Sequence, residues 1–306
     1  MSLPSYVHCP CEVPLLGETI GICLDRIAAT YPDNEAVVSI HQNLRFTYHE
    51  FNQIVNRAAK ALINLGIERG DRVAIWSTNN YEWVVAQFAT AKIGAILVNV
   101  NPAYRVHELE YVLKQSRCKV LMLIESFKTS NYVDMFYKVC HEVKECDPGH
   151  IDSWRFPHLK SVVFIGSTQY PGMFTRRAFA ELGDELPDDV LLERRAQLEF
   201  DDDINIQYTS GTTGFPKGVT LTHHNILNNA YFVAQTMKLT DKDRLCVPVP
   251  FYHCFGMVLA NLACVTAGAT IVIPGPSFEA TATLQAVEQE KCTALHGVPT
   301  MFIAEL

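Results

Sequence analysis

The most informative stretch of the sequence is the run Tyr208–Gly218, whose residue types suit the binding of a polyphosphate. It reads Tyr-Thr-Ser-Gly-Thr-Thr-Gly-Phe-Pro-Lys-Gly. Glycines let the backbone approach an anion and turn its N–H groups inward. The hydroxyl groups add hydrogen-bond donors, and Lys217 adds a mobile positive charge. An ordinary surface turn is the simpler alternative, but it does not explain so many anion donors in one place.

The order of residues in this run distinguishes it from a P-loop. A P-loop has the pattern G-x-x-x-x-G-K-[ST], and a helix begins there. Here Lys217 precedes Gly218, and the next residues, 219–222, alternate as in a strand. A helix is predicted only after Thr222, a suitable N-cap for His223 and His224. The pattern therefore predicts strand–loop–strand and disfavours a P-loop phosphotransferase.

The chain resembles the AMP-forming adenylating enzymes, which include acyl-CoA synthetases, luciferases and the adenylation domains of peptide synthetases. Residues 209–218 match the signature Thr-Ser-Gly-Thr-Thr-Gly-x-Pro-Lys-Gly in full. Pro250-x-x-His253-x-x-Gly256 is similar to the second motif of the family, and residues 297–300 to a segment that opens a helix near the acyl pocket. Residues 100–108 resemble a stretch common in the acyl-CoA synthetase branch. The resemblance extends over nearly the whole chain.

This resemblance implies ATP-dependent activation of a carboxylic acid, with a fatty acid favoured, followed by thioester formation with CoA. A carboxylate oxygen attacks the α-phosphorus of ATP in line and pyrophosphate leaves. The CoA thiol then displaces AMP. Charge builds on the β- and γ-phosphates, so N–H donors, Mg²⁺ and a cation are needed there. The implied cofactors and partners are ATP or AMP, Mg²⁺, the acid and CoA.

The resemblance also assigns roles to individual residues. The phosphate contacts fall on the loop residues Thr209, Ser210, Gly211, Thr212, Thr213, Gly214 and Lys217, with Lys217 also catalytic and Thr212 meeting Mg²⁺ through ATP. His253 would lie between the substrate carboxylate and the α-phosphate, where an imidazole can hold two anions in attack geometry. A structural histidine in a turn is the alternative. Phe251, Tyr252 and Gly297 would border the acid, although core packing explains the two rings equally simply.

Composition narrows the class of protein. The chain has 306 residues, 48% of them hydrophobic and 19% charged, which indicates a globular α/β protein with a large core. A net charge of −8 disfavours nucleic acid as a partner. Ten cysteines without C-x-x-C or metal-ligand spacing indicate a reducing compartment. The N-terminus shows no signal peptide, so a cytoplasmic protein is expected. The composition is also compatible with a homo-oligomer.

Residues 256–273 are uncharged over a length that could span a membrane. Asn261, Thr266 and Thr270 interrupt the stretch, and Gly268 breaks it. The pattern favours a buried helix, a glycine turn and a strand over an integral membrane segment.

Short apolar strands alternate with amphipathic helices along the chain and predict mostly parallel sheets buried on both faces. We expect a helix at 18–31, a hairpin at 35–47 and a helix opened by a capping box at Thr47. Residues 166–203 look irregular, with one short helix near 176–183. Strand, helix, Gly-Ala and strand recur in the same order around Gly94 and Gly268.

The fold class expected is α/β, with two related sheets packed with helices and a small β-rich region. The first αβ subdomain is expected at about 35–165 and the second at about 204–306, with the ligand in a crevice where the strands end.

The family's adenylating domain continues with a Tyr-Gly-x-Thr-Glu motif, a later aspartate and a lid domain with a catalytic lysine, and none of these occurs here. The sequence stops inside a predicted helix that begins near Pro299. We therefore expect residues 1–306 to be an incomplete N-terminal AMP-binding domain that is not competent alone. The alternatives are an aryl, amino or short-chain acid as substrate, or a non-catalytic nucleotide-binding fragment.

Overall fold

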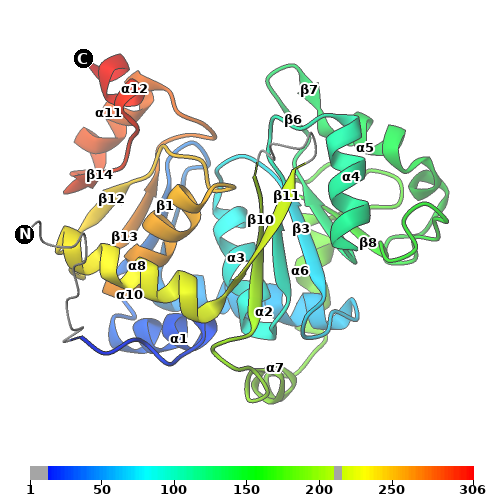
Figure 1. Ribbon diagram of the computed structural model, residues 1–306, viewed down its shortest axis with the longest axis horizontal. Coiled ribbons are helices and arrows are strands. Elements are labelled where there is room, and N and C mark those ends of the chain that lie inside the picture. The colour runs from blue at the N-terminus through cyan, green and yellow to red at the C-terminus, as the bar shows by residue number, and fades with distance from the viewer. Residues whose placement is uncertain (1–12, 210–215) are drawn as a thin grey trace, which may run out of the picture.

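Two β-sheets with helices between and around them form the chain (Figure 1), in a computed structural model that describes residues 13–209 and 216–306. The seven-stranded sheet has the order β11-β10-β4-β3-β5-β8-β9. Its strands are β3 (Arg72–Trp76), β4 (Ile96–Asn99), β5 (Val120–Leu123), β8 (Ser161–Phe164), β9 (Phe174–Thr175), β10 (Asp203–Thr209) and β11 (Lys217–Thr222). All pairs are parallel except β10 with β11.

The second sheet has five strands in the order β14-β12-β13-β1-β2. Its strands are β1 (Glu35–Ser39), β2 (Leu44–Thr47), β12 (Arg244–Cys246), β13 (Thr270–Ile273) and β14 (Ala294–Leu295). The predicted hairpin at 35–47 is the antiparallel pair β1–β2, and the other pairs are parallel. A small antiparallel pair, β6 (Ser126–Phe127) with β7 (Ser130–Asn131), is the β-rich region. The expected α/β class is confirmed.

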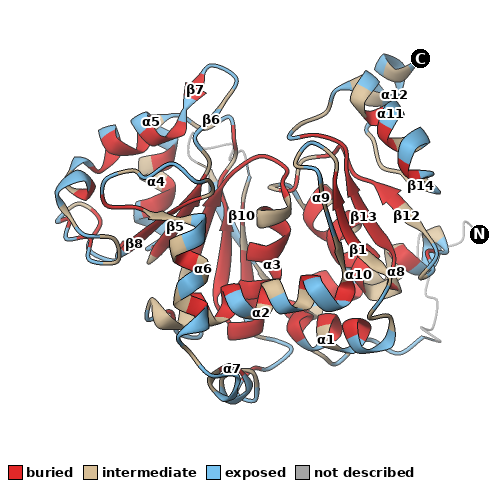
Figure 2. Cartoon of the chain, turned by 180° about the vertical axis from the view of Figure 1, so that it is seen from behind, coloured by how far each residue is buried: buried red, intermediate tan, exposed pale blue. Residues whose placement is uncertain are grey.

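Helices fill the space between the two sheets and join their inner faces into one core (Figure 2). These helices are α1 (Ile20–Thr30), α2 (Tyr48–Asn64), α3 (Tyr81–Ile93), α8 (His223–Met237) and α10 (Ala263–Ala267). A second core lies on the other face of the seven-stranded sheet under α4 (Val106–Ser116) and α5 (Tyr132–Val139). The central strands β3, β4, β5 and β8 are therefore buried on both faces, as their apolar sequences predict.

Local signals in the sequence fix several element ends. Thr47 and Glu50 form the predicted capping box of α2. Gly94 ends α3 at φ 71° and Gly268 ends α10 at φ 73°, in the left-handed region that favours glycine. The two Gly-Ala sites thus have the same structural role, one before each sheet's next strand.

The two sheets do not follow the two halves of the chain. Residues 35–47 were expected in the first subdomain, but β1 pairs with β13 in the second sheet. Residues 204–222 were expected in the second subdomain, but β10 pairs with β4 in the first sheet. The boundaries at 35–165 and 204–306 therefore need correction. The reason is that a parallel pair can join strands that are far apart in sequence, and no local pattern reports that pairing.

The region expected to be irregular contains a second helix. The helix near 176–183 is α6 (Arg176–Asp184), and α7 (Asp188–Arg195) follows it. Sequence periodicity missed α7 because it buries only Leu191. Residues 254–267 form α9 (Cys254–Gly256), the π-helix η2 (Met257–Leu262) and α10, before β13 begins. Among the described residues no helix is long and apolar enough to cross a membrane.

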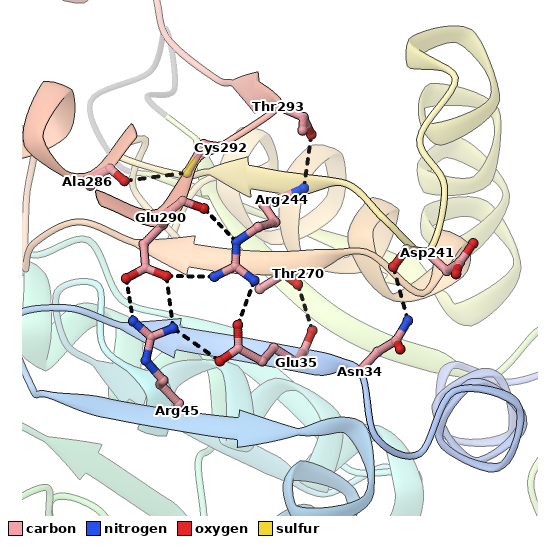
Figure 3. A network of polar contacts seen from close by, with 10 residues as sticks. All are labelled: Asn34, Glu35, Arg45, Asp241, Arg244, Thr270, Ala286, Glu290, Cys292 and Thr293. Atoms are coloured by element: carbon pink, nitrogen blue, oxygen red, sulfur yellow. Dashed lines mark hydrogen bonds and ion pairs between the residues drawn. The ribbon is translucent and has the colours of Figure 1, made fainter. Parts of the chain in front are cut away.

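The end of the five-stranded sheet opposite the candidate site is held by a network of alternating charges (Figure 3). Glu290, at the end of α11 (Ala280–Glu290), is buried and bonds both Arg45 and Arg244. Arg244 also donates to Glu35 at 2.6 Å. Because a buried carboxylate without partners is costly, the two guanidinium groups stabilise this packing of α11 on the sheet.

We expect Glu290→Gln to lower the free energy of unfolding by about 2 kcal/mol, because charge-assisted bonds are lost and two arginines lose an acceptor. The bonds with Arg45 hold the pKa of Glu290 below its ordinary value. Its stabilisation is therefore complete above the unfolded pKa and is lost as pH falls through the lower folded pKa. Urea unfolding at pH 7 and at acid pH measures this. Glu288→Gln, on the exposed face of the same helix, is the matched control.

His223 supplies a second pH-dependent contribution. Its ring is fully buried at the start of α8, and its Nδ1 accepts from the backbone N–H of Ile20 at 3.2 Å. Burial lowers the pKa of His223 to about 4. The unfolded chain thus binds a proton at a higher pH than the folded chain does, which makes acid destabilising.

We expect stability to fall as pH drops from about 6.5 to about 4, by roughly 2–4 kcal/mol from His223 alone. His223→Gln keeps an acceptor for Ile20 and should flatten this part of the stability curve, whereas the half-buried neighbour His224→Gln should not. Unfolding midpoints across pH 4–7 are the measurement. Equal slopes in the two variants would show that His223 does not titrate as described.

Candidate active site

The predicted phosphate loop joins two paired strands at an edge of the seven-stranded sheet. β10 and β11 are antiparallel, and Thr209 pairs with Lys217 at the mouth of the loop. The predicted strand–loop–strand arrangement is therefore confirmed. Because β10 runs parallel to β4 and β3, the loop leaves the sheet at its carboxyl end, where α/β proteins bind ligands. Both Thr209 and Lys217 are exposed.

Most of the loop lies outside the described residues, which resume at Pro216. The phosphate contacts expected of Ser210, Gly211, Thr212, Thr213 and Gly214, and the Mg²⁺ contact through Thr212, remain predictions. In the described ranges 13–209 and 216–306, no group of three His, Cys, Asp or Glu side chains could hold a metal ion.

The second motif forms a tight turn after β12. His253 is exposed and caps α9, and its Nδ1 accepts from the N–H of Phe255 at 3.1 Å. A neutral ring that accepts at Nδ1 has its proton on Nε2, so Nε2 can donate to an anion. Gly256 is required here because a Cβ would stand 2.4 Å from the carbonyl oxygen of Pro250. The turn therefore presents an exposed imidazole in one tautomer.

Asn79, which follows β3, ties this turn to the seven-stranded sheet. Its Nδ2 donates to the carbonyl of Val249 at 2.9 Å, and its Oδ1 accepts from the N–H of Phe251 at 2.9 Å. Its own N–H donates to the carbonyl of Pro276 at 3.1 Å. One buried residue thus holds the segment after β12 with its side chain and the segment after β13 with its backbone N–H.

A second asparagine connects the two motifs more directly. Asn99 ends β4, pairs in register with Gln207 of β10, and donates from Nδ2 to the carbonyl of Tyr252 at 3.0 Å. Gln207 stands two residues before Thr209, and Tyr252 precedes His253. The structure therefore brings the base of the phosphate loop and the histidine turn together where the two sheets meet.

The site residues that sequence reasoning missed are Asn79, Asn99, Asn205 and Gln207. A signal was present, because Asn205 and Gln207 alternate with Ile204 and Ile206 in a predicted strand. Polar side chains two apart on one face of a buried strand need partners across that face.

A cavity of about 200 Å³ opens at this junction, beside Tyr252. Its walls come from the loops after β3, β4, β12 and β13 and include Thr78, Asn79, Asn101, Pro102, Pro248, Pro250, Tyr252, Pro276, Phe278 and Met301. A larger cavity of about 310 Å³ lies among α2, α3 and α6, and neither motif lines it. We place the site at the smaller cavity because Pro250 and Tyr252 of the second motif line it, and Asn99 ties that turn to the strand that precedes the phosphate loop.

The residues expected to border the acid fall into different environments. Phe251 is fully buried, and its ring centroid lies 5.7 Å from that of Trp83, so it packs as a core residue. Tyr252 is half-buried on the cavity wall, where burial raises the pKa of its hydroxyl. Gly297 lies under the ring of Phe302, which a Cβ would approach to 2.9 Å. Gly297 thus lets α12 (Pro299–Glu305) fold back over the segment after β14.

The fold brings the strands of the phosphate loop and the histidine turn to one junction between the two sheets. The family model for AMP-binding enzymes matches residues 24–306. The chain belongs to the AMP-binding enzyme family.

Similar proteins support the same class. The chain is 49% identical over 292 residues to YngI of Bacillus subtilis (strain 168), provisionally named an acyl-CoA synthetase, with 95% of this chain and 53% of YngI covered. It is 43% identical to the mitochondrial medium-chain acyl-CoA ligase ACSF2 of Danio rerio, with 98% and 50% covered. The N-terminal domain of FACL13 from Mycobacterium tuberculosis, solved with an inhibitor, matches with a TM-score of 0.76 and 26% identity. That match covers 94% of this chain and 65% of the solved one.

The chain spans about half the length of the curated relatives it matches. It corresponds in extent to most of an N-terminal domain such as that of FACL13.

Proposed function

We propose that this chain supplies the phosphate loop and the acid-facing histidine of an AMP-forming acid–thiol ligase. The observation behind the proposal is the bond from Asn99 to the carbonyl of Tyr252, which joins the loop strand to the histidine turn. A phosphate loop alone would indicate nucleotide binding. A donor beside it, at the carboxyl ends of two sheets, adds the means to hold a second anion against the nucleotide.

Each residue has a separate part in the proposed reaction. When bound, ATP supplies the adenylyl group and a pyrophosphate leaving group. The exposed Lys217 stands at the mouth of the loop, where its charge can reach the phosphates as negative charge builds. His253 offers its Nε2 proton to the acid carboxylate or the α-phosphate and holds the two in line. The half-buried wall at Tyr252 excludes water from one side of the acid.

The acid proposed is a fatty acid of medium or long chain. Support comes from the name of the ACSF2 relative, a medium-chain acyl-CoA ligase, and from the resemblance of residues 100–108 to the acyl-CoA synthetase branch. An aryl, amino or short-chain acid uses the same chemistry and is the alternative. Free cysteines such as Cys23, Cys118 and Cys264 fit a reducing compartment, and the cytoplasm is the location proposed.

ATP–pyrophosphate exchange by the full-length product of the gene tests the acid class. We expect exchange that depends on a fatty acid of medium or long chain, because each buried methylene adds about 0.8 kcal/mol of binding. Exchange only with aryl or amino acids would move the substrate within the family. Nucleotide binding without exchange for any acid would favour the non-catalytic alternative.

The same assay tests the two site residues. We expect Lys217→Ala and His253→Ala each to lower the rate of acid-dependent exchange by about 100-fold, the typical cost of removing one donor from developing charge. Lys242→Ala and His158→Ala change exposed residues outside the site and should keep full exchange. If both site variants exchange at the rate of these controls, the site has been placed wrongly.

A further inference from the structure

Three buried amide side chains form a continuous path from the phosphate-loop strand to the histidine turn. Gln207 and Asn205 lie on β10, and Asn99 ends β4. Gln207 Nε2 donates to Asn205 Oδ1 at 2.9 Å. Asn205 Nδ2 donates to Asn99 Oδ1 at 2.9 Å, and Asn99 Nδ2 donates to the carbonyl of Tyr252 at 3.0 Å. The next residue is His253.

The direction of this path is fixed by the backbone. Asn205 Nδ2 also donates to the carbonyl of Leu97 on β4 at 2.9 Å, which sets the orientation of its amide. Asn99 must then present its oxygen to Asn205 and its NH₂ group to Tyr252. Asn99 and Asn205 are 3% and 2% exposed, so water is not available to either. A flipped Asn99 would place NH₂ against NH₂ and leave buried groups unbonded, at a cost of about 1–3 kcal/mol each.

The end of the path acts on the peptide that joins Tyr252 to His253. The N–H of His253 donates to the carbonyl of Pro250 at 3.3 Å, within the turn itself. The bond from Asn99 comes from the other sheet. It therefore fixes the turn relative to β10 rather than only within itself.

We propose that Asn99 is a positioning residue for His253, and that Asn205 and Gln207 couple its position to the base of the phosphate loop. This rests on the proposed function, in which His253 holds the acid against the nucleotide bound by that loop. A displacement of about 1 Å in such an arrangement can lower a rate by about 100-fold. One bonded path thus sets the separation between the two anion-holding elements.

The competing explanation is that the amides only satisfy one another in a buried place. It predicts lost stability on substitution but no specific loss of catalysis. Asn228 is a matched control, because it is 6% exposed and bonds Leu16 in both directions and the carbonyl of His224. None of these residues belongs to the proposed site.

The experiment compares Asn99→Leu with Asn228→Leu in the full-length product, using ATP–pyrophosphate exchange. Both variants should lose similar stability. Asn99→Leu should lower kcat about 10- to 100-fold, with KM for ATP changed less than about threefold, while Asn228→Leu keeps kcat. In a His253→Ala background, Asn99→Leu should add little, because both changes remove the same interaction.

Equal kcat in the two leucine variants would overturn the proposal, and so would effects of Asn99→Leu and His253→Ala that simply multiply. A wild-type protein without acid-dependent exchange would instead contradict the proposed function.

If the wild-type protein shows no exchange, a spectroscopic measurement can still test whether Asn99 positions His253. The ring ¹H–¹⁵N signals of His253, assigned by their loss in His253→Ala, should shift in Asn99→Leu and stay in place in Asn228→Leu. Signals that stay in place in both variants would refute positioning through Asn99.

Discussion

The burial of α3 beyond its first two residues is the constraint on which the rest of the structure depends. Every residue from Trp83 to Ile93 is buried, because the helix lies between the two sheets and carries apolar residues on all sides, with Gln87 and Thr90 among them. Lys92 is the one charged residue in this buried run. Its Nζ donates to Asp25 and Asn52, both at 2.6 Å, and to Asn56 at 2.5 Å, and burial lowers its pKa to about 8. A helix packed against both sheets cannot slide or rotate without opening the core on both sides.

The fixed helix in turn fixes the loop that precedes it. Asn80 caps α3 by accepting from the N–H of Trp83 at 2.7 Å. This cap fixes the backbone next to Asn79 and so the position of the Asn79 side chain. From that place Asn79 bonds the segments that follow two strands of the other sheet. Trp83 packs on Phe251 at the same point. Core packing therefore determines the geometry of the histidine turn through the first turn of α3, Asn79 and Asn80. A hydrophobic constraint in this way positions a polar site.

Much of this could be predicted from the sequence, because the signals are local. The capping box at Thr47, the glycine ends at Gly94 and Gly268, and the strand after Lys217 follow from residue types over a few positions. The membership of β1 in the five-stranded sheet and of β10 in the seven-stranded sheet could not be predicted, because strand pairing depends on contacts between distant parts of the chain. Phe251 could not be separated from Tyr252 for the same reason. Phe251 and Tyr252 are adjacent aromatic residues in the sequence, and only the position of Trp83 in the structure shows that Phe251 is the one that packs in the core.

The amides at the sheet junction suit the two anions, the phosphates and the acid, of the proposed function. A lysine in place of Asn99 would add a buried charge that needs its own partner and would compete with Lys217 for the phosphates. An aspartate would repel both the phosphates and the acid. An amide adds no net charge, yet each one has a donor and an acceptor at fixed positions. Gln207, Asn205 and Asn99, bonded one to the next, therefore have a single orientation of their amide groups that satisfies all three bonds. In the proposed function, a protein with a net charge of −8 would align two anions through the geometry of neutral amides, with Lys217 adding positive charge only at the mouth of the loop.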